Sequence, residues 1–546
     1  MDLVLVGLPG SGKSVVGRRF AQRHGAAFLD LDELVERLAG RPIPAIFEEE
    51  GEAGFRALER RVVAGLGPAD ADPTVRRVIA AGGGTPVDPR NRWFLYRGRV
   101  VAWLDGPPEV LAQRLRRSVH VRPLVAGRDP IGTVRQLAAS RRRFYAPAVH
   151  LNALGQVQAI LRSLEEAVAG GPPAGTVLLE AETPIGTLQL GSGNVVTGVL
   201  AALGRLEARR AILVSEPGAW AAVGEDLASR LAVDGVAVDH VLLPQGEDAK
   251  RLSVVEEAAR SLARLRVERG EPIVAVGGGA LGDPAGFLAA TYLRGVPLVH
   301  VPTTLLAQVD SAIGGKTGVD LPEGKNLVGA FYQPAAIVVD VAVLASQLER
   351  QRRAALGEAV KMALLGDERL FELLETAGPA IAAGEPSAVE SGAVAELVER
   401  CAWAKVEVVL ADERELGGRI TLNLGHSLGH AIEAAAGYRD LLHGEAVAHG
   451  LRGAVGVGLA LGLTPPERAA RALELLDALG LAVQPPAVDP AAVRAHLGVD
   501  KKHAGGRLRW VLPVASGVVV RSDVPDGAVE AGLRAALAGS PRAAAR

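Results

Sequence analysis

The sequence feature that constrains the fold most is a glycine-rich loop near the N-terminus. Asp2–Val6 is an apolar run typical of a buried strand, and Gly7–Ser14 (GLPGSGKS) follows it and opens a helical pattern. Glycines in such a loop let backbone N–H groups wrap a phosphate, a lysine reaches the terminal phosphate oxygens, and a hydroxyl can hold Mg²⁺. The order strand, loop and helix therefore indicates an α/β fold that binds a nucleoside triphosphate.

Further motifs follow this loop before residue 169. Asp30 and Asp32 alternate as on a strand, which predicts that both lie on one face, one for Mg²⁺ and one for a substrate hydroxyl, although paired aspartates also cap helices. Arg56 and Glu59 are three apart on an expected helix, either as a surface pair or as a carboxylate clamp held by its partner. Val78–Gly84 is a strand pattern that ends in glycines, where the backbone approaches a neighbour closely. A segment of this size suits a small-molecule kinase.

Residues 1–168 resemble shikimate kinase, because these motifs and Arg122-Pro123-Leu124, in an arginine-rich stretch, stand in that family's order. The resemblance implies a P-loop fold and phosphorylation of shikimate by ATP and Mg²⁺, which needs mainly positioning and charge neutralisation. A gluconate-type kinase is the alternative, and the motif Gly-Glu-x-x-Phe-Arg argues against it. The implied catalytic residues are Lys13, Asp32 and Arg122. The implied contacts are Gly10, Ser11, Gly12, Lys13, Ser14, Val15 and Arg122 for ATP, Ser14 and Asp30 for Mg²⁺, and Asp32, Arg56, Gly83 and Arg141 for shikimate.

A Gly/Pro-rich stretch over residues 169–182 separates this segment from the rest of the chain. Its composition is that of a linker, so we expect independent domains on either side. Beyond it, Ala211–Ser215 and Pro272–Val276 are strand patterns that alternate with helical stretches, which predicts a parallel α/β domain over 183–340. Helical periodicity dominates 341–546.

The strand pattern Pro272–Val276 runs into a glycine turn, Gly277–Gly282, followed by Asp283. A turn of this kind at the carboxyl end of a strand is where open α/β sheets bind dinucleotides. It is not the standard GxGxxG pattern, so a tightly packed structural turn is the alternative. Upstream, Glu247 and Lys250 could reach a ribose or cap a helix.

A cluster of histidines late in the chain predicts a metal site. His426 and His430 are four apart and share one face of a helix, and His443 could converge with them on a divalent ion. Ser427 stands where a HExxH metalloprotease has its glutamate, which excludes that class of site. Glu358 adds a carboxylate, with an amine one helical turn away. The alternative is that core hydrogen bonds satisfy the histidines.

Lysine is rare in this chain. Only eight of the 60 basic residues are lysines, and each lies beside a Gly, Asp, Glu or His motif. Arginine and lysine differ in shape, hydration and capacity for pKa tuning, so the rare lysines are candidates for compact-charge contacts to phosphate or carboxylate. Random residual usage is the alternative. The eight are Lys13, Lys250, Lys316, Lys325, Lys361, Lys405, Lys501 and Lys502.

From about Gly186 to the late 520s the chain resembles 3-dehydroquinate synthase. The glycine turn, Val301–Thr304, Asp310–Lys316, Gly324–Asn326 and the histidine cluster stand in that family's order. The resemblance implies a Rossmann-like NAD domain over 183–340 and a mostly helical domain over 341–546 that binds metal and substrate. It also implies that His430 lies near the substrate phosphate, which corrects the first interpretation of the cluster.

The resemblance also implies a role for each matching residue. The implied ligands of one divalent metal, zinc or cobalt, are Glu358, His426 and His443. The implied NAD contacts are Glu247, Asp248, Lys250, Gly279, Ala280, Leu281, Gly282, Asp283, Thr303, Thr304, Lys316 and Lys325. The implied substrate contacts are Arg294, Asp310, Lys316, Asn326, Lys361, Lys405, Arg419, Asn423, His430, Lys501 and Lys502. Of these, Lys316, Lys361, Lys405, Arg419 and His430 are the implied catalytic residues.

The implied reaction converts 3-deoxy-D-arabino-heptulosonate 7-phosphate to 3-dehydroquinate and phosphate. A ring alcohol is oxidised, phosphate leaves, the carbonyl is reduced again, and an aldol step closes the carbocycle, so NAD is regenerated. The alternatives are another sugar-phosphate cyclase, a metal-dependent polyol dehydrogenase with net NADH production, and a half without activity. Ser215-Glu216-Pro217 stands where the family commonly has Thr-Asp, which leaves the adenosine contacts unassigned.

Charge and composition narrow the class of protein. The formal net charge of −2 excludes a strongly basic nucleic-acid surface, no apolar run is long enough for a membrane span, and the chain enters its first strand without a basic leader. One cysteine, Cys401, excludes internal disulfides and fits a reducing cytoplasm. We expect a cytoplasmic enzyme with small-molecule partners, no nucleic acid and no membrane, and a homodimer through the synthase-like half, as is common in that family.

Overall fold

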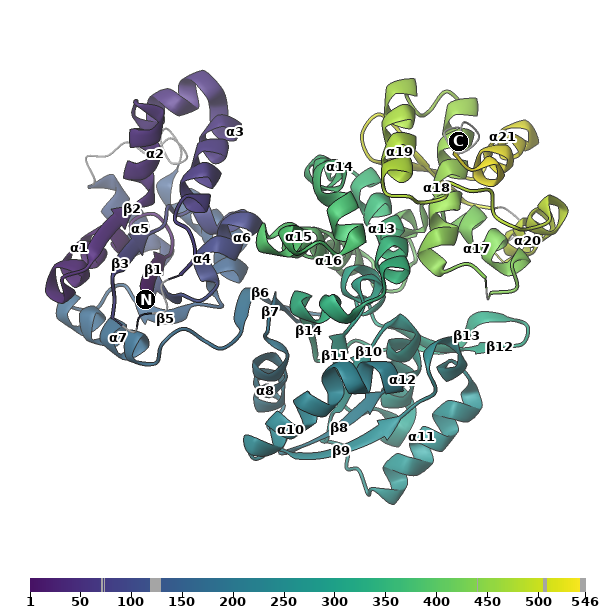
Figure 1. Cartoon of the computed structure of the whole chain (residues 1–546), viewed down its shortest axis with the longest axis horizontal. Helices are drawn as coiled ribbons and strands as arrows, with labels where there is room; N and C mark the ends of the chain where they lie inside the picture. The colour runs from purple at the N-terminus through teal and green to yellow at the C-terminus, as the bar shows by residue number, and fades with distance from the viewer. Residues whose placement is uncertain (70–71, 73, 118–128, 439, 504–507, 541–546) are drawn as a thin grey trace. The chain divides into compact units, whose positions relative to one another are not determined.

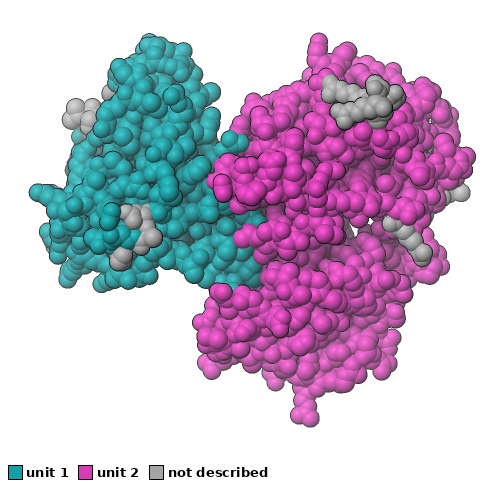
Figure 2. All heavy atoms as spheres, viewed as in Figure 1, with its two compact units in different colours: residues 1–183, 187–199, 338–341 teal, residues 184–186, 200–337, 342–546 magenta. Residues whose placement is uncertain are grey.

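The computed structural model describes the whole chain except residues 70–71, 73, 118–128, 439, 504–507 and 541–546 (Figure 1). For residues 499–503 it describes the backbone but not the side chains. The chain forms two compact units, coloured separately in Figure 2. The first comprises residues 1–183, 187–199 and 338–341, and the second comprises 184–186, 200–337 and 342–546.

The first part of the chain forms a parallel sheet. Its strand order is β2-β3-β1-β4-β5, and neighbouring strands run in the same direction. Leu3 and Val4, which point to opposite faces of β1, are both fully buried, as expected for a parallel sheet that is covered on both faces. The elements are β1 (Asp2–Val6), α1 (Lys13–His24), β2 (Ala27–Asp30), α2 (Leu31–Ala39), α3 (Ile43–Ala64), β3 (Arg77–Ala80), η1 (Thr85–Val87), α4 (Pro89–Tyr96), β4 (Val100–Asp105), α5 (Pro108–Arg116), α6 (Pro130–Tyr145), β5 (Val149–Asn152) and α7 (Val157–Ala169).

The two aspartates after Phe28 do not share a strand face, so that prediction is wrong. Strand β2 ends at Asp30, and α2 begins at Leu31. Asp30 caps this helix, because its Oδ1 accepts a hydrogen bond from the backbone N–H of Asp32 at 3.1 Å. A short acidic side chain directly before a helix satisfies an N–H that has no intrahelical partner, and this local bond outweighs the strand-like alternation.

A second sheet has the strand order β6-β7-β14-β11-β10-β8-β9. Strands β14, β11, β10, β8 and β9 are parallel, as the alternation of strand and helix patterns predicted. Strands β12 and β13 form a separate antiparallel ribbon. The elements are β6 (Thr176–Thr183), β7 (Gly186–Ser192), α8 (Val195–Arg205), β8 (Arg210–Ser215), α9 (Pro217–Ala219), η2 (Trp220–Gly224), α10 (Glu225–Val233), β9 (Ala237–Leu242), η3 (Gly246–Ala249), α11 (Leu252–Arg264), β10 (Ile273–Gly277), α12 (Gly279–Thr291), η4 (Tyr292–Arg294), β11 (Leu298–Pro302), η5 (Ala307–Ser311), β12 (Lys316–Leu321), β13 (Gly324–Phe331) and β14 (Ala336–Asp340).

The segment between the two sheets is shorter than the linker predicted over 169–182. Helix α7 ends at Ala169, and β6 already begins at Thr176. The glycines and prolines are confined to the first part of this stretch, whereas Leu178, Leu179 and Ala181 are apolar and buried. Burial of these side chains makes residues 176–183 a strand, and composition alone extended the linker too far.

The rest of the chain is mostly helical, as expected. Cys401 is fully buried on α16, where it packs in the core. Among the described residues, no helix combines the length and the apolar character that crossing a membrane requires. The elements are η6 (Val341–Ser346), α13 (Glu349–Leu364), α14 (Glu368–Ala383), α15 (Pro386–Glu390), α16 (Ala393–Ala411), η7 (Gly418–Asn423), α17 (His426–Ala435), α18 (His443–Ala460), α19 (Pro466–Ala478), α20 (Pro490–His503), β15 (Trp510–Pro513), β16 (Val518–Arg521) and α21 (Asp526–Ala538).

Candidate active sites

The loop between β1 and α1 depends on its glycines. Gly10 and Gly12 have φ of 85° and 91°, a left-handed conformation that favours glycine. A Cβ on Gly7 would lie 2.5 Å from a main-chain oxygen of β4. Lys13 Nζ donates hydrogen bonds to the carbonyl oxygens of Gly7 and Leu8, at 2.8 and 3.1 Å. The ammonium group therefore lies inside the loop, where phosphate oxygens can take the place of the carbonyls.

Ser14 and Asp30 form a pair of oxygen groups beside the loop. Ser14 Oγ donates a hydrogen bond to Asp30 Oδ2 at 2.7 Å. Ser14 lies in the first turn of α1 and Asp30 is the last residue of β2, so the sheet and the helix together fix the pair. Hydroxyl and carboxylate oxygens are ligands that suit Mg²⁺, and the pair fits that ion.

A second polar group lies beside the turn that follows β3. Arg56 NH1 donates to Glu59 Oε2 at 2.8 Å, and Thr85 Oγ1 donates to Glu59 Oε1 at 2.6 Å. Arg141 NH1 donates to the carbonyl oxygen of Gly83 at 2.7 Å. Burial by itself lowers the pKa of Arg56, but the carboxylates of Glu59 and Glu52 together offset this and raise it. The guanidinium group therefore stays charged and can hold an anionic substrate.

Asp32 approaches the same turn. A Cβ built on Gly82 would lie 2.7 Å from Asp32 Oδ1, and one built on Gly84 would lie 2.5 Å from Arg56 NH2. The glycines of this turn thus leave room for a carboxylate and a guanidinium group directly against the backbone. A carboxylate and two guanidinium groups around one small space suit a substrate that has hydroxyl groups and a negative charge.

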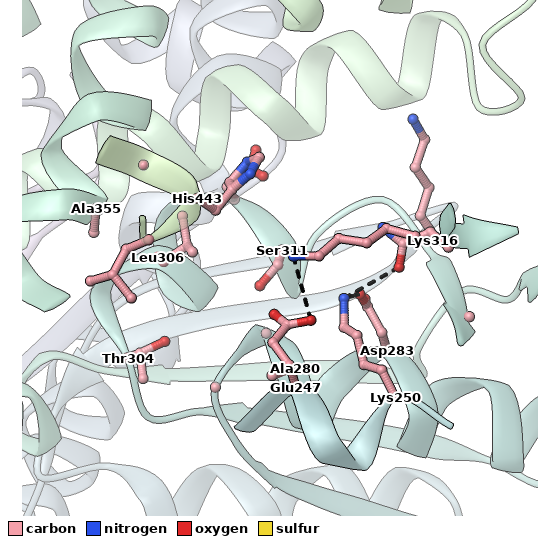
Figure 3. Close-up of a pocket in the computed structure, with 18 of the residues that line it drawn as sticks. Glu247, Lys250, Ala280, Asp283, Thr304, Leu306, Ser311, Lys316, Ala355 and His443 are labelled. Carbon is pink, nitrogen blue, oxygen red and sulfur yellow. Dashed lines mark hydrogen bonds and ion pairs between the residues drawn. The ribbon is translucent and has the colours of Figure 1, made fainter. Parts of the chain in front are cut away.

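A cavity of about 890 Å³ opens in the second unit. Its wall includes the turn after β10, segment η5, the β12–β13 ribbon and side chains from helices α13, α16, α17 and α18. In Figure 3, Glu247, Lys250 and Asp283 lie on one side of this space and His443 on another. This volume lies within the range of roughly 300–1,000 Å³ that is typical of ligand pockets.

Glu358 on α13, His426 on α17 and His443 on α18 converge beside this cavity. His426 Nε2 lies 3.5 Å and His443 Nε2 lies 3.3 Å from Glu358 Oε1. Around a tetrahedral ion with bonds of about 2.0–2.1 Å, ligand atoms lie roughly 3.3 Å apart. The Glu358 carboxylate is fully buried, and its oxygens contact the two imidazoles and the ammonium group of Lys361. The three residues therefore fit a divalent cation.

Buried charges next to this group pair with one another. Lys361 forms an ion pair with Glu358, and its Nζ lies 3.7 Å from Asp310 Oδ1. Lys405 Nζ contacts the same Asp310 oxygen at 2.7 Å. Burial raises the pKa of Asp310, but the two ammonium groups outweigh burial and lower it to about 2. Burial lowers the pKa of both lysines. The carboxylates of Glu358 and Asp310 outweigh burial at Lys361, so the pKa of Lys361 is raised. At Lys405 burial outweighs Asp310, and the charge of Lys361 adds to its effect, so the pKa of Lys405 is lowered.

The opposite side of the cavity is formed around the turn between β10 and α12. Lys250 Nζ lies 2.6 Å from Asp283 Oδ2 and donates to Asn326 Oδ1 at 3.3 Å. A Cβ on Gly279 would lie 2.6 Å from Ser311 Oγ, so the backbone is closely approached here. Helix α12 begins at Gly279, and its N-terminus supplies the partial positive charge that favours a pyrophosphate.

Comparison with known proteins decides between the possible families. The family model for shikimate kinase matches residues 9–167, and the N-terminal and C-terminal models for 3-dehydroquinate synthase match 240–354 and 355–503. The 3-dehydroquinate synthase of Halorhodospira halophila is 46% identical over 341 residues, which cover 62% of this chain and 93% of that protein. That of Symbiobacterium thermophilum is 44% identical over 350 residues, or 62% and 96% of the two chains. This chain belongs to the 3-dehydroquinate synthase family.

A shikimate kinase precedes the synthase in the same polypeptide. The chain is a bifunctional enzyme of the shikimate pathway, a kinase and a lyase. Among solved structures, the 2-epi-5-epi-valiolone synthase ValA of Streptomyces hygroscopicus subsp. jinggangensis, with NAD⁺ and Zn²⁺ bound, is 31% identical with a TM-score of 0.59, and covers 64% of this chain and 96% of its own. Another cyclase or a polyol dehydrogenase is not favoured, because identity to the dehydroquinate synthases is higher.

In the kinase half, most predicted site residues lie in the two groups described above. The nucleotide loop carries Gly10, Ser11, Gly12 and Lys13, and Val15 follows in the first turn of α1, more than half exposed. Arg122 falls outside the described residues. Thr85 was missed, because a lone threonine after a glycine turn gives no signal in the sequence.

In the synthase half, the cavity brings together most of the predicted residues. Those that line it are Glu247, Lys250, Gly279, Ala280, Asp283, Thr304, Asp310, Lys316, Lys325, Asn326, Lys361, Lys405, Arg419, Asn423, His426, His430 and His443. Asp248, Leu281, Gly282, Arg294 and Thr303 do not line it. Leu281 packs in the apolar core, and Asp248 pairs with Arg251 where both are exposed. Lys501 and Lys502 lie on α20, and their side chains are outside what the structure describes.

Two glutamates of the synthase half were missed by sequence reasoning. Glu415 forms an ion pair with Lys316 and accepts a hydrogen bond from Asn423 Nδ2 at 2.9 Å. Glu433 lies in the cavity wall on α17. Its position, seven after His426 on the same helix, places both on one face, so helical spacing could have identified it. Glu415 precedes the motif in an acidic loop, which gives no comparable signal.

Proposed function

We propose that the roles implied by the family resemblance hold for the residues of this chain. The kinase occupies residues 1–168, the NAD-binding domain extends to 340, and the helical domain follows from 341. One observation carries the proposal for the second half: three metal-type ligands lie beside the cavity that is also lined by five of the eight lysines and by the dinucleotide-type turn. Oxidation, phosphate loss and ring closure on one sugar require all of these in one place.

For the kinase, each group has a task that matches its position. Lys13 holds the oxygens of the transferred phosphate, and Ser14 with Asp30 holds Mg²⁺, which supplies charge neutralisation when bound. Arg56 and Arg141 hold the shikimate carboxylate. Asp32 accepts a hydrogen bond from the attacking hydroxyl and orients it. Gly83 gives the substrate access to the backbone, and Arg122 closes over the phosphates.

For the synthase, Glu358, His426 and His443 hold one zinc or cobalt ion. When bound, this ion supplies Lewis acidity, and NAD⁺ supplies a reversible hydride acceptor. Residues on the side of the β10–α12 turn bind and orient the dinucleotide. They are the predicted NAD contacts that line the cavity: Glu247, Lys250, Gly279, Ala280, Asp283, Thr304, Lys316 and Lys325.

The substrate is held between these two groups by cations and amides. Arginine and lysine side chains bind its carboxylate and phosphate through charge-assisted hydrogen bonds. Lys405 is one of these cations, and Asp310 holds its ammonium group in place at 2.7 Å. The remaining proposed contacts are Lys316, Asn326, Lys361, Arg419, Asn423 and His430, which line the cavity, and Lys501 or Lys502.

The test is phosphorus NMR of the purified chain with NAD⁺, Zn²⁺ or Co²⁺ and the heptulosonate phosphate, without ATP. We expect inorganic phosphate to appear with no net NADH, and the reaction to stop on chelation of the metal. The variant Lys13→Met serves as control, because it lies in the kinase loop and should release phosphate at the wild-type rate. Net NADH, or an unchanged substrate, would contradict the synthase assignment. Addition of ATP and shikimate to the wild type should then give shikimate 3-phosphate.

We also propose that the enzyme works in the cytoplasm as a homodimer formed through the synthase half. A single buried cysteine is consistent with a reducing compartment. Sedimentation equilibrium of the full chain and of Lys13→Met should give twice the chain mass of 56.5 kDa. A monomer at micromolar concentration would contradict the dimer.

A further inference from the structure

His443 lies between two carboxylates. Its Nε2 is 3.3 Å from Glu358 Oε1, and its Nδ1 is 3.4 Å from Glu433 Oε2. Glu433 is buried, with 3% of its surface exposed. An imidazole that binds a cation through one nitrogen carries its proton on the other, and that proton needs an acceptor. Glu433 stands where this acceptor is required.

The second oxygen of Glu433 faces the dinucleotide side of the cavity. Glu433 Oε1 accepts a hydrogen bond from Lys325 Nζ at 2.8 Å. Lys325 Nζ also lies 3.6 Å from Glu247 Oε2 and 5.0 Å from the ring centre of Tyr438. One buried carboxylate therefore contacts a residue of each half of the proposed site, His443 on the metal side and Lys325 on the NAD side.

We propose that Glu433 is a positioning residue that links the metal group to the dinucleotide group. It accepts the Nδ1 proton of His443, so that Nε2 is the nitrogen presented toward Glu358 and His426, and it holds Lys325 at the edge of the NAD side. This inference rests on the proposed function of the synthase half. A carboxylate behind a metal-binding histidine fixes its orientation and makes the ligand more basic, and its loss typically weakens metal binding by about 10–100-fold.

The same atoms allow a competing arrangement. His430, Glu433 and His443 form a second group whose ligand atoms lie within 4.8 Å of one another, and this group could hold a cation of its own. A second ion would need Nδ1 of His443 as a ligand, while Nε2 of the same residue binds the first ion. It would also displace Lys325 from Glu433. The contacts of Glu433 with Lys325 and with the histidine ring favour the positioning role. The number of ions bound per chain distinguishes the two.

The test compares metal binding by Glu433→Gln with that by the wild type, using zinc in competition with a chromogenic chelator. Glutamine keeps the size of the side chain and removes its charge. The matched control is Glu396→Gln, because Glu396 is also buried and paired with arginines, Arg369 and Arg400, but does not line the cavity. We expect one ion per wild-type chain, affinity about 10–100-fold weaker in Glu433→Gln, and unchanged affinity in the control.

Two further readouts separate positioning from loss of structure. With Co²⁺ in place of Zn²⁺, the visible absorption bands of Glu433→Gln should shift, because the orientation of one ligand changes, whereas those of Glu396→Gln should not. The variant Lys325→Met keeps the contact between Glu433 and His443, so it should bind zinc within about threefold of the wild type and bind NAD⁺ more weakly in a calorimetric titration.

Each outcome decides the question. Equal zinc affinity and an unchanged cobalt spectrum in Glu433→Gln would overturn the positioning role while leaving the proposed function intact. Two ions per wild-type chain, one of them lost in the variant, would overturn it in favour of the second metal site. A wild-type chain that binds no zinc would refute the metal site of the proposed function, and this inference would fall with it.

Discussion

The two active sites of this chain are built in different ways. The kinase loop is one continuous run, Gly7–Ser14, in which backbone geometry and a single ammonium group make the phosphate site. The synthase site takes its charges from helices and turns that lie far apart in the sequence, such as Asp310 and Lys405. In the loop Lys13 contacts carbonyl oxygens, whereas in the synthase the charged side chains pair with one another.

This difference predicts how each site responds to substitution. A loop lysine held by carbonyl oxygens can be removed without leaving a charge unpaired in the protein interior. Removal of one member of a buried ion pair leaves its partner uncompensated, which destabilises the fold as well as the site. Function and stability should therefore be separable in the kinase and coupled in the synthase.

The largest expected effect is from removal of the transition metal. With a zinc-selective chelator and Mg²⁺ in excess, phosphate release from the heptulosonate phosphate should stop completely, because Glu358, His426 and His443 then hold no Lewis acid. Shikimate phosphorylation in the same sample should continue at its initial rate. Both reactions are followed by phosphorus NMR. If the kinase reaction stops as well, the two sites do not differ in their dependence on the transition metal.

Substitution of the loop lysine should have the next largest effect. Lys13→Met removes the one ammonium group held inside the loop, and we expect the turnover number for shikimate to fall by about 10²–10³-fold or more, as for loss of one main electrostatic stabiliser. The synthase rate serves as internal control and should be unchanged. A fall of less than tenfold would mean that Lys13 does not hold the transferred phosphate.

Asp310→Asn tests the coupling of function and stability in the synthase. The substitution leaves Lys361 and Lys405 without their shared carboxylate, so we expect the free energy of unfolding to fall by about 3 kcal/mol. This is the lower end of the range for a broken buried ion pair, because a fifth of the Asp310 side chain is exposed. Hydrogen exchange of peptides from α13 and α16 measures the local loss. Lys13→Met is the matched variant in the other unit, and its α1 peptide should change little.

A pH series of the same exchange experiment should show a slightly smaller effect. The pKa of Asp310 is lowered to about 2 in the folded chain, so the stability it contributes is present above its unfolded value of 3.8 and is lost as the pH falls toward 2. This difference corresponds to about 2 kcal/mol. The loss of stability between pH 4 and pH 2 should be smaller in Asp310→Asn by this amount, because the other buried carboxylates still titrate there. An identical pH profile for the two proteins would contradict the contribution of Asp310.

The smallest effect is expected at Cys401, which should not react at all in the folded chain. The thiol is fully buried, and burial raises its pKa, although Lys361 nearby lowers it. Buried thiols with a raised pKa are unreactive toward alkylating reagents. Mass spectrometry after treatment with iodoacetamide should find label only when denaturant is present. Labelling of the native chain at pH 8 would mean that solvent reaches the interior of the synthase half.

Most of the fold could be predicted from local motifs, and a smaller part depended on interactions that such motifs do not show. The order of strands and helices, and the turn after β10, follow from patterns in short stretches, and the structure agrees with them. Sequence reasoning failed at Asp30 and Asp32, where a capping hydrogen bond outweighs strand-like alternation, and at residues 176–183, where burial of apolar side chains outweighs the neighbouring linker composition. In the first case a hydrogen bond, and in the second case burial in the core, determined the secondary structure.

The sequence by itself determined the kinase loop, because every group in it is placed by the backbone of eight consecutive residues, Gly7–Ser14. It also singled out His426, His430 and His443 and the scarce lysines, and the structure places the three histidines and five of the lysines in the wall of one cavity. Only the tertiary structure decided that Glu433 contacts both His443 and Lys325, and that Glu415 contacts Lys316. Those pairs join segments about 10 to 108 residues apart, and ion pairs between distant segments depend on how helices pack, which no local spacing encodes.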